Sequence, residues 1–246
     1  MTKQPSNLPI KGAQLERRGS YLAVVFHPSI RLTRKRGFEF AAELSQYIEP
    51  SNVHLDENQW RFDQPLEGST RSRFKIIVGV QRIQINAEFP ETSAEWLESR
   101  QTEILDRFHK MLDLKHVIQS AAMIQATFPV DGDARTFLAN HVMHLDREQV
   151  KKLNRPIHTV GLRFMLPPFK EEGAVARKED WLLEVKVESL VEDPSKVYVE
   201  ADAQWQNTPM LWDVEATRTV VNRQVKVSEY LKDHVLEFLT HCEGGE

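Results

Sequence analysis

The sequence predicts an α+β protein in which antiparallel strands carry helices on one face. Apolar and polar residues alternate over residues 181–189 and again over 197–205, which is typical of antiparallel strands covered on one side. Apolar residues recur at helical spacing near residues 36–48, 91–114 and 228–241. Amphipathic helices and one-sided strands in the same chain are typical of two packed layers.

The order of the predicted elements favours an internal duplication. It reads β-α-β-β-α and then β-α-(α)-β-β-β-α, so we expect two similar β-α-β-β-α halves. In each half an apolar strand runs into a proline, a polar turn and a helix with a phenylalanine near its start. The predicted divisions are a polar N-terminal arm over residues 1–18, a first half over 19–115, and a second half with the C-terminal helix over 116–246.

The first half begins with a strand and a helix. Residues 20–28 are rich in β-forming residues and end at a proline, which predicts a strand. A helix is predicted from about Arg36 to Ile48, and Pro50 ends it. The apolar face of this helix consists of Phe38, Ala41, Leu44, Ser45 and Ile48.

Residues 73–90 contain a change of register. They are predicted as one long strand, after a weaker strand over 54–65 and a turn over 66–72. The apolar residues occupy even positions at first and odd positions later, and the parity changes around Gln81 and Arg82. A one-residue β-bulge would restore the register.

Residues 91–114 give the clearest helix of the chain. Thr92 and Glu95 have the spacing of a capping box at its start. The apolar stripe of this helix consists of Leu97, Ile104, Leu105, Phe108, Met111 and Leu112.

The second half repeats this organisation with an added strand. Residues 121–129 predict a strand, and two helical segments follow, the second over 146–153. Residues 157–168 predict a further strand, and 169–180 a charged loop. The alternating hairpin comes next, and a helix over 228–241 closes the chain.

Composition excludes several classes of protein. Of the 246 residues, 41% are hydrophobic and 28% are charged, as in folded globular proteins. There is no apolar run of the ~18 residues that a membrane span needs, and no secretory signal. The single cysteine, Cys242, cannot form an internal disulfide, so we expect a reducing, cytoplasmic compartment. No glycine-rich phosphate-binding loop is present, and we expect no cofactor.

Positive charge is concentrated in the first third of the chain. Residues 1–82 contain 13 Lys or Arg and 8 Asp or Glu, a net +5, whereas residues 83–246 contain 19 and 28, a net −9. Several cations stand at the start of the first predicted helix, where the helix dipole is itself positive and disfavours them. We interpret two acid-poor runs as one basic patch for an anionic partner: Arg31, Arg34, Lys35, Arg36, Arg71, Arg73, Lys75 and Arg82.

A structural explanation of these cations is also open. They would be neutralised by docking on the acidic face of the hairpin, within one molecule or in a homodimer, or they would simply be solvated. The acidic residues in question are Glu184, Glu188, Glu200 and Asp202.

Two histidines are candidate metal ligands. His141 and His144 have a spacing that places both imidazoles on one face of a helix, and Asp131, Asp133 and Asp146 lie nearby in sequence. A metal site needs three or four converging ligands, and no second ligand motif occurs elsewhere, so we expect no metal site and interpret the pair as two histidines of a partly exposed helix.

A phosphoesterase motif occurs only once. Residues 27–30 have the form His-x-Ser/Thr-hydrophobic. In this tetrad the chain resembles the 2H phosphoesterases, whose catalytic signature consists of two tandem copies of it. The best second copy, at His158, lacks the intervening residue, which removes the matched acid and base. Cys242, near the chain end, is not preorganised as a nucleophile.

Three features of the second half carry a family resemblance: the strand GLRF at residues 161–164, the hairpin after it, and the final amphipathic helix. In these features the chain resembles a sporadically distributed family of uncharacterised bacterial proteins of about 250 residues. The resemblance implies this architecture and a bacterial or phage origin. It implies no activity and no catalytic residue.

The sequence therefore favours a non-enzymatic binding or assembly protein that acts through protein–protein contacts. The alternative is a nucleic-acid-associated protein that uses the basic N-terminal patch, and a further alternative is a phosphoesterase or metal-dependent enzyme. We expect a protein partner, either a different protein or a second copy of this chain. Nucleic acid is the alternative partner, and we expect no membrane association.

Overall fold

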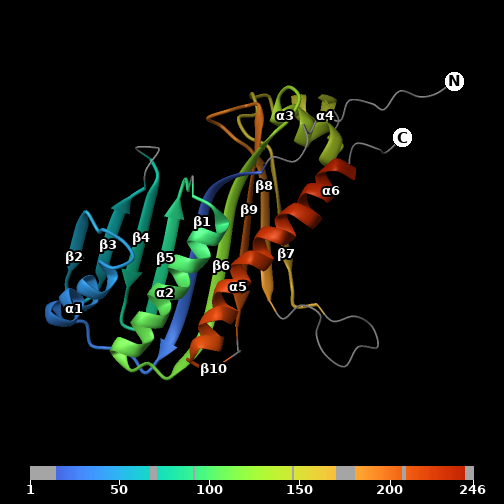
Figure 1. Ribbon diagram of the computed structural model, residues 1–246. Helices are drawn as coiled ribbons and strands as arrows, with labels where there is room; N and C mark the ends of the chain where they lie inside the picture. Colours follow the sequence, from blue (N-terminus) through green and yellow to red (C-terminus); the bar gives the residue numbers. More distant parts are fainter. Residues whose placement is uncertain are drawn as a thin grey trace.

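A computed structural model describes residues 15–66, 71–90, 92–145, 147–169, 181–206 and 209–241. It confirms the α+β class, with one antiparallel sheet and helices packed on one face (Figure 1). The strand order is β2-β3-β4-β5-β1-β6-β9-β8-β7, and β10 pairs with the beginning of β6. The two halves expected from the sequence therefore share one continuous sheet.

Two long strands, β1 (Glu16–His27) and β6 (His116–Pro129), form the centre of the sheet and are antiparallel. Because β1 begins at Glu16, the last residues assigned to the N-terminal arm belong to the sheet. A register shift between Arg17 and Gly19 marks a bulge, and it places Arg17 on the helix-covered side.

The hairpin of β4 (Arg73–Val78) and β5 (Arg82–Glu88) replaces the long strand predicted over residues 73–90. The amide of Gly79 donates a hydrogen bond to the carbonyl of Arg82 at 2.7 Å, which closes a tight turn. The change of parity is therefore caused by chain reversal and not by a bulge. The weaker strand before it is likewise a hairpin, of β2 (Asn52–Leu55) and β3 (Trp60–Pro65).

Helix α1 (Arg34–Leu44) buries a different face from the predicted one. Gly37, Phe40 and Leu44 are buried, with the spacing i, i+3, i+7. Phe38 lies about a quarter of a turn away from this stripe and is 63% exposed. The prediction that Phe38 belongs to the core is wrong, because the adjacent Gly37 occupies the buried position.

Helix α2 (Ala94–Leu112) confirms the predicted stripe but not the predicted cap. The hydroxyl of Ser93, and not that of Thr92, accepts a hydrogen bond from the amide of Trp96, at 3.2 Å. The helix packs beside α1 and α5 on the sheet.

The predicted hairpin of the second half is confirmed as β8 (Leu182–Ser189) and β9 (Lys196–Trp205), with the apolar residues of both strands buried. Residues 170–180 of the predicted charged loop lie outside the described residues. The remaining elements are α3 (Ala134–Phe137), the π-helical turn η1 (Leu138–Val142), α4 (Arg147–Lys151), β7 (Gly161–Leu166) and β10 (Met210–Leu211).

The C-terminal helix begins well before the predicted start at Ser228. It comprises α5 (Val214–Tyr230), the π-helical turn η2 (Leu231–Val235) and α6 (Leu236–His241). The buried side of α5 includes polar residues, so its first turns lack the continuous apolar spacing from which a helix is predicted. The guanidinium of Arg223 is buried, donates to the hydroxyl of Ser120 at 2.6 Å and lies over the ring of Trp205.

The helix layer covers one face of the sheet, with α1, α2 and α5 side by side (Figure 1). An aromatic cluster joins α1, α2 and the segment before α5 to the central strand β1: Phe26 and Phe108 lie 5.4 Å apart, Phe40 and Phe108 5.3 Å, and Phe108 and Trp212 6.2 Å. None of the helices described here combines the length and the apolar character that crossing a bilayer requires.

The strand order is similar on both sides of the centre, apart from β2, which lies at the edge beyond β3 and has no counterpart beyond β7. Outward from β1 lie β5, β4 and β3, and outward from β6 lie β9, β8 and β7. This symmetry agrees with the order of elements in the sequence. The internal duplication itself stays a prediction.

Candidate functional site

The start of α1 carries the four cations of the first basic run. The hydroxyl of Thr33 caps the helix by accepting a hydrogen bond from the amide of Arg36, at 3.3 Å. The first turn contains no acidic residue. All four side chains are exposed, and none forms an ion pair within 4 Å with any residue that the structure describes: Arg31, Arg34, Lys35 and Arg36.

Buried neighbours hold these cations in place. Ile30 and Leu32 are buried on either side of Arg31, and the amide of Ile30 donates to the carbonyl of Val80 at 2.9 Å. A Cβ on Gly37 would lie 2.7 Å from a methyl of Leu55, so this glycine permits α1 to approach β2 closely. The anchors fix the backbone, and the cations project from it.

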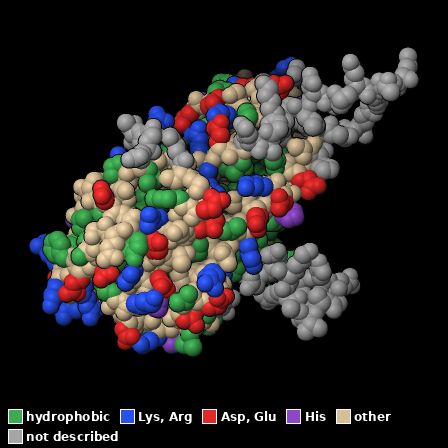
Figure 2. All heavy atoms as spheres, in the orientation of Figure 1, with side chains coloured by type: hydrophobic (Ala, Val, Ile, Leu, Met, Phe, Trp, Pro, Cys, Tyr) green, Lys and Arg blue, Asp and Glu red, His purple; other side chains and the backbone are tan. Residues whose placement is uncertain are grey.

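Phe38 lies among the cations and was missed as a functional candidate. It follows Arg34 by four residues and Lys35 by three, so the three side chains are neighbours on the surface of α1. We call Arg31, Arg34, Lys35, Arg36 and Phe38 the α1 surface. Figure 2 shows Lys and Arg side chains gathered at the end of the molecule where α1 lies. One sequence signal could have identified Phe38, namely the glycine before it. If Gly37 occupies the buried position of the helix, the next residue, Phe38, turns toward solvent.

The second basic run does not join the α1 surface as one face. Arg82 follows the turn that is hydrogen-bonded to the Arg31 segment, so it lies at the same end of the sheet. Arg73 and Lys75 lie on β4 facing away from the helix layer, and Lys75 pairs with Glu88 at 2.5 Å. Arg71 lies in the turn before β4.

The acidic residues of the hairpin lie on the face of the sheet opposite the helices. Two are ion-paired on this face, Glu184 with Arg163 at 2.7 Å and Glu188 with Lys186 at 3.0 Å. Because α1 belongs to the helix layer, these acids do not neutralise the α1 surface within one molecule. For the α1 surface, the intramolecular docking considered from the sequence is therefore wrong, whereas the charge of Arg82 does act on Asp202 of the hairpin.

A hydrogen-bonded network crosses the centre of the same face. The hydroxyl of Tyr21 donates to Gln125 at 3.2 Å, and the amide of Gln125 donates to Glu200 at 2.8 Å. The hydroxyl of Tyr198 also donates to Glu200, at 2.6 Å. Burial, and then the bond to Glu200, raises the pKa of Tyr198. Burial, and then the neighbouring acids Glu200 and Glu184, raises the pKa of Asp202.

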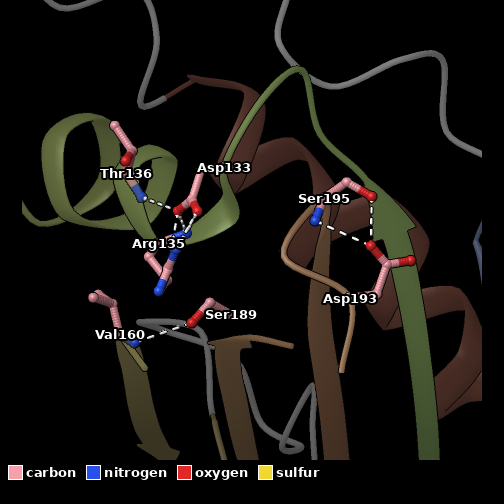
Figure 3. Close-up of polar contacts among 7 residues, drawn as sticks. All are labelled: Asp133, Arg135, Thr136, Val160, Ser189, Asp193 and Ser195. Atoms are coloured by element: carbon pink, nitrogen blue, oxygen red, sulfur yellow. Dashed lines mark hydrogen bonds and ion pairs between the residues drawn. The ribbon is translucent and has the colours of Figure 1, made fainter. Parts of the chain in front are cut away.

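A cavity of about 490 Å³ opens between η1, α4 and the beginning of β7. Asp133 caps α3 at its mouth and pairs with Arg135 at 2.6 Å (Figure 3). The hydrogen bond from Arg135 lowers the pKa of Asp133, and the same bond raises the pKa of Arg135. Asp133 and Arg135 neutralise each other, so neither is an available acid or base in this cavity.

The predicted metal ligands are not brought together. His141 lies on η1 with its ring against Phe137 at 5.8 Å, and His144 follows the end of that turn with a φ of 50°. Among the described residues, no group of three or more His, Cys, Asp or Glu could hold a metal ion. Cys242 lies outside the described residues.

The two histidines of the phosphoesterase motif lie at opposite ends of the sheet. His27 ends β1, and its ring neighbour at 6.5 Å is His116 on β6. His158 precedes β7, whose first residue lies at the level where β1 begins. A 2H mechanism needs one acid and one base facing the same phosphoester, and this pair does not supply them.

No protein-family model matches this chain, and no curated protein matches it. The resemblance to an uncharacterised bacterial family stays a prediction.

Proposed function

We propose that this protein is a non-enzymatic binding protein whose α1 surface docks on an acidic protein surface that contains an apolar pocket. The observation that carries the proposal is the exposure of Phe38 beside Arg34 and Lys35 on the surface of α1. An aromatic side chain among arginines is typical of the residues that dominate protein–protein affinity. In this position the cations weaken the helix, and recognition explains why they stand there.

A protein partner fits this surface better than a nucleic-acid backbone does. Phosphate binding gains from an extended run of free cations. Here Arg73 and Lys75 of the second basic run face the other side of the sheet, and Lys75 is already paired with Glu88. The α1 surface is therefore compact and has an apolar centre, which supports a pocket ringed by acidic residues as its counterpart.

The test is capture of partners from a lysate of the source organism by three forms of the immobilised protein. Phe38→Ser removes the apolar anchor, and Val191→Ser, at a residue 51% exposed in a distant turn, is the matched control. We expect wild type and Val191→Ser to retain the same proteins in low salt, and Phe38→Ser to lose them at an unchanged melting temperature.

The captured protein is then purified and titrated against the three forms. A Kd weakened about tenfold or more by Phe38→Ser alone, and weakened by salt in wild type, supports the proposal. Equal affinity of Phe38→Ser and wild type rejects it. Retention of duplex or single-stranded DNA or RNA, lost on replacing Arg34 and Lys35 with Gln but not on changing Phe38, would assign the surface to nucleic acid instead.

A further inference from the structure

A second candidate site lies at the opposite end of the helix layer, in a cleft between the first turns of α2 and the last turns of α5. The cleft has a volume of about 220 Å³, and its floor is formed by Arg17 of β1 and Ile124 of β6. Leu97, Glu98 and Gln224 form part of its walls. The α1 surface lies beyond the other end of α2, so the two sites are independent.

Two buried hydrogen-bond donors of α5 line this cleft without a partner. The side chain of Gln224 is 5% exposed, and its Nε2 has no hydrogen-bond acceptor in the described structure. Ser228 lies one helical turn later and is 7% exposed, and its Oγ also has no hydrogen-bond partner in the described structure. Buried polar groups in folded proteins are almost always hydrogen-bonded, so two orphaned donors in one cleft indicate a missing acceptor.

Arg17 supplies a third donor and a positive charge. The bulge after it in β1 places its side chain at the cleft, where it forms no hydrogen bond and no ion pair within 4 Å with the described residues. Burial lowers the pKa of Arg17, and the more distant charges of Glu98 and Glu95 oppose this effect. A half-buried guanidinium without a direct partner is costly unless an anion approaches it.

The N-terminus of α2 adds a further preference for negative charge. Ala94 and Glu95, in the first turn of this 19-residue helix, line the cleft. Hydrogen bonding to its own amide and to Ser93, together with the charge of Arg17, lowers the pKa of Glu95, so the carboxylate is charged at this helix terminus. The helix dipole and Arg17 therefore act on the same side of the cleft.

The acidic rim limits the charge of the ligand. Glu95, Glu98 and Glu229 line the cleft, and Lys232 is the one cation besides Arg17 among its lining residues. A dianion such as phosphate would meet these carboxylates, whereas a single carboxylate can accept from the donors at smaller electrostatic cost. We propose that the cleft binds the carboxylate of a small organic acid or amino acid through Arg17, Gln224 and Ser228.

The test is isothermal titration of the full chain, dialysed into a buffer whose only small anion is chloride, with acetate, glycine and inorganic phosphate. We expect acetate or glycine to bind with one site per chain and phosphate to bind more weakly. Tighter binding of glycine than of acetate assigns a zwitterion whose ammonium faces Glu98 or Glu229, and the reverse order assigns a simple acid.

Three substitutions locate the binding. Gln224→Leu and Ser228→Ala each remove one donor, and each should weaken binding about tenfold or more, as for a hydrogen bond to a charged group. The matched control is Gln101→Leu, because Gln101 is also buried with an unpartnered amide but does not line the cleft. It should leave the Kd unchanged.

The outcomes that overturn the proposal are equally defined. No binding of acetate or glycine to wild type means that the donors are satisfied by water. Equal binding by Ser228→Ala and wild type, a substitution small enough to preserve the fold, places the ligand elsewhere. Phosphate binding tighter than acetate rejects the carboxylate assignment. None of these results depends on the partner of the α1 surface.

Discussion

The imidazole of His109 stacks on the indole of Trp212, with ring centroids 5.6 Å apart and planes 18° from parallel. His109 lies in the last turn of α2 and Trp212 precedes α5, so the stack joins the two longest helices at one end of the layer. The indole of Trp212 also donates to the hydroxyl of Thr217 at 3.1 Å. Burial, opposed in part by Asp106, lowers the pKa of His109.

Stability should therefore fall as the pH drops below about 6.5, the ordinary pKa of histidine. In that range the unfolded chain binds a proton at His109 and the folded chain does not, so acid favours unfolding. We expect the free energy of unfolding to fall more steeply for wild type than for His109→Gln, which cannot be protonated. Urea unfolding of both proteins at a series of pH values measures this, and parallel curves would contradict the assignment.

Asp202 should destabilise the protein at neutral pH. Its pKa is raised, so the folded chain retains the proton at pH values where the unfolded chain has lost it, and stability decreases as pH rises above about 3.9. Asp202→Asn should raise the melting temperature at pH 7 and have little effect near pH 3. Asp193→Asn is the control of opposite sign. The hydrogen bond from Ser195 lowers the pKa of Asp193, so the charged carboxylate stabilises the fold and its removal should lower the melting temperature at pH 7. A lower melting temperature for Asp202→Asn at pH 7 would show that its charge is stabilising.

The register of the β8–β9 hairpin predicts opposite tolerances for adjacent residues. Val185 is buried, and its burial contributes about 1.5–3 kcal/mol, to which Val185→Asp adds the cost of an enclosed carboxylate. This variant should unfold or aggregate. Glu184→Lys breaks a half-exposed ion pair with Arg163 and should lower stability by no more than about 1 kcal/mol. Thermal melts of the two variants test the register. Equal changes in melting temperature for Val185→Asp and Glu184→Lys would refute it.

The cations at the start of α1 should not contribute to folding. Replacing Arg34, Lys35 and Arg36 with Gln should leave the melting temperature unchanged or slightly higher, because the helix dipole disfavours positive charge there. Lys110→Gln is the control of opposite sign, since Lys110 lies in the last turn of α2 and pairs with Asp106 at 2.7 Å. It should lower the melting temperature by a small amount. A clear loss of stability in the triple variant would mean that the cations have a structural partner.

The elements that could be predicted from the sequence are those whose side-chain period is unbroken. The β8–β9 hairpin alternates strictly from one end to the other, and α2 keeps one apolar stripe through its length. In both, the local pattern and the tertiary burial agree, so reading the pattern is sufficient. The pattern of residues 73–90 was read wrongly as one strand with a bulge. A reversal of the chain and a bulge both change the parity of the apolar positions, so the pattern alone does not distinguish them.

The sequence by itself determined the α+β class, the one-sided strands and the cations at the start of α1. Only the tertiary structure decided which side of α1 is buried, since Gly37 fits against Leu55 and leaves Phe38 in solvent. It also decided that Arg73 and Lys75 face the side of the sheet away from α1, and that Arg17, Gln224 and Ser228 meet in one cleft. Contacts between residues far apart in the chain depend on strand order and close packing, and the periodicity of a local segment contains no information about either.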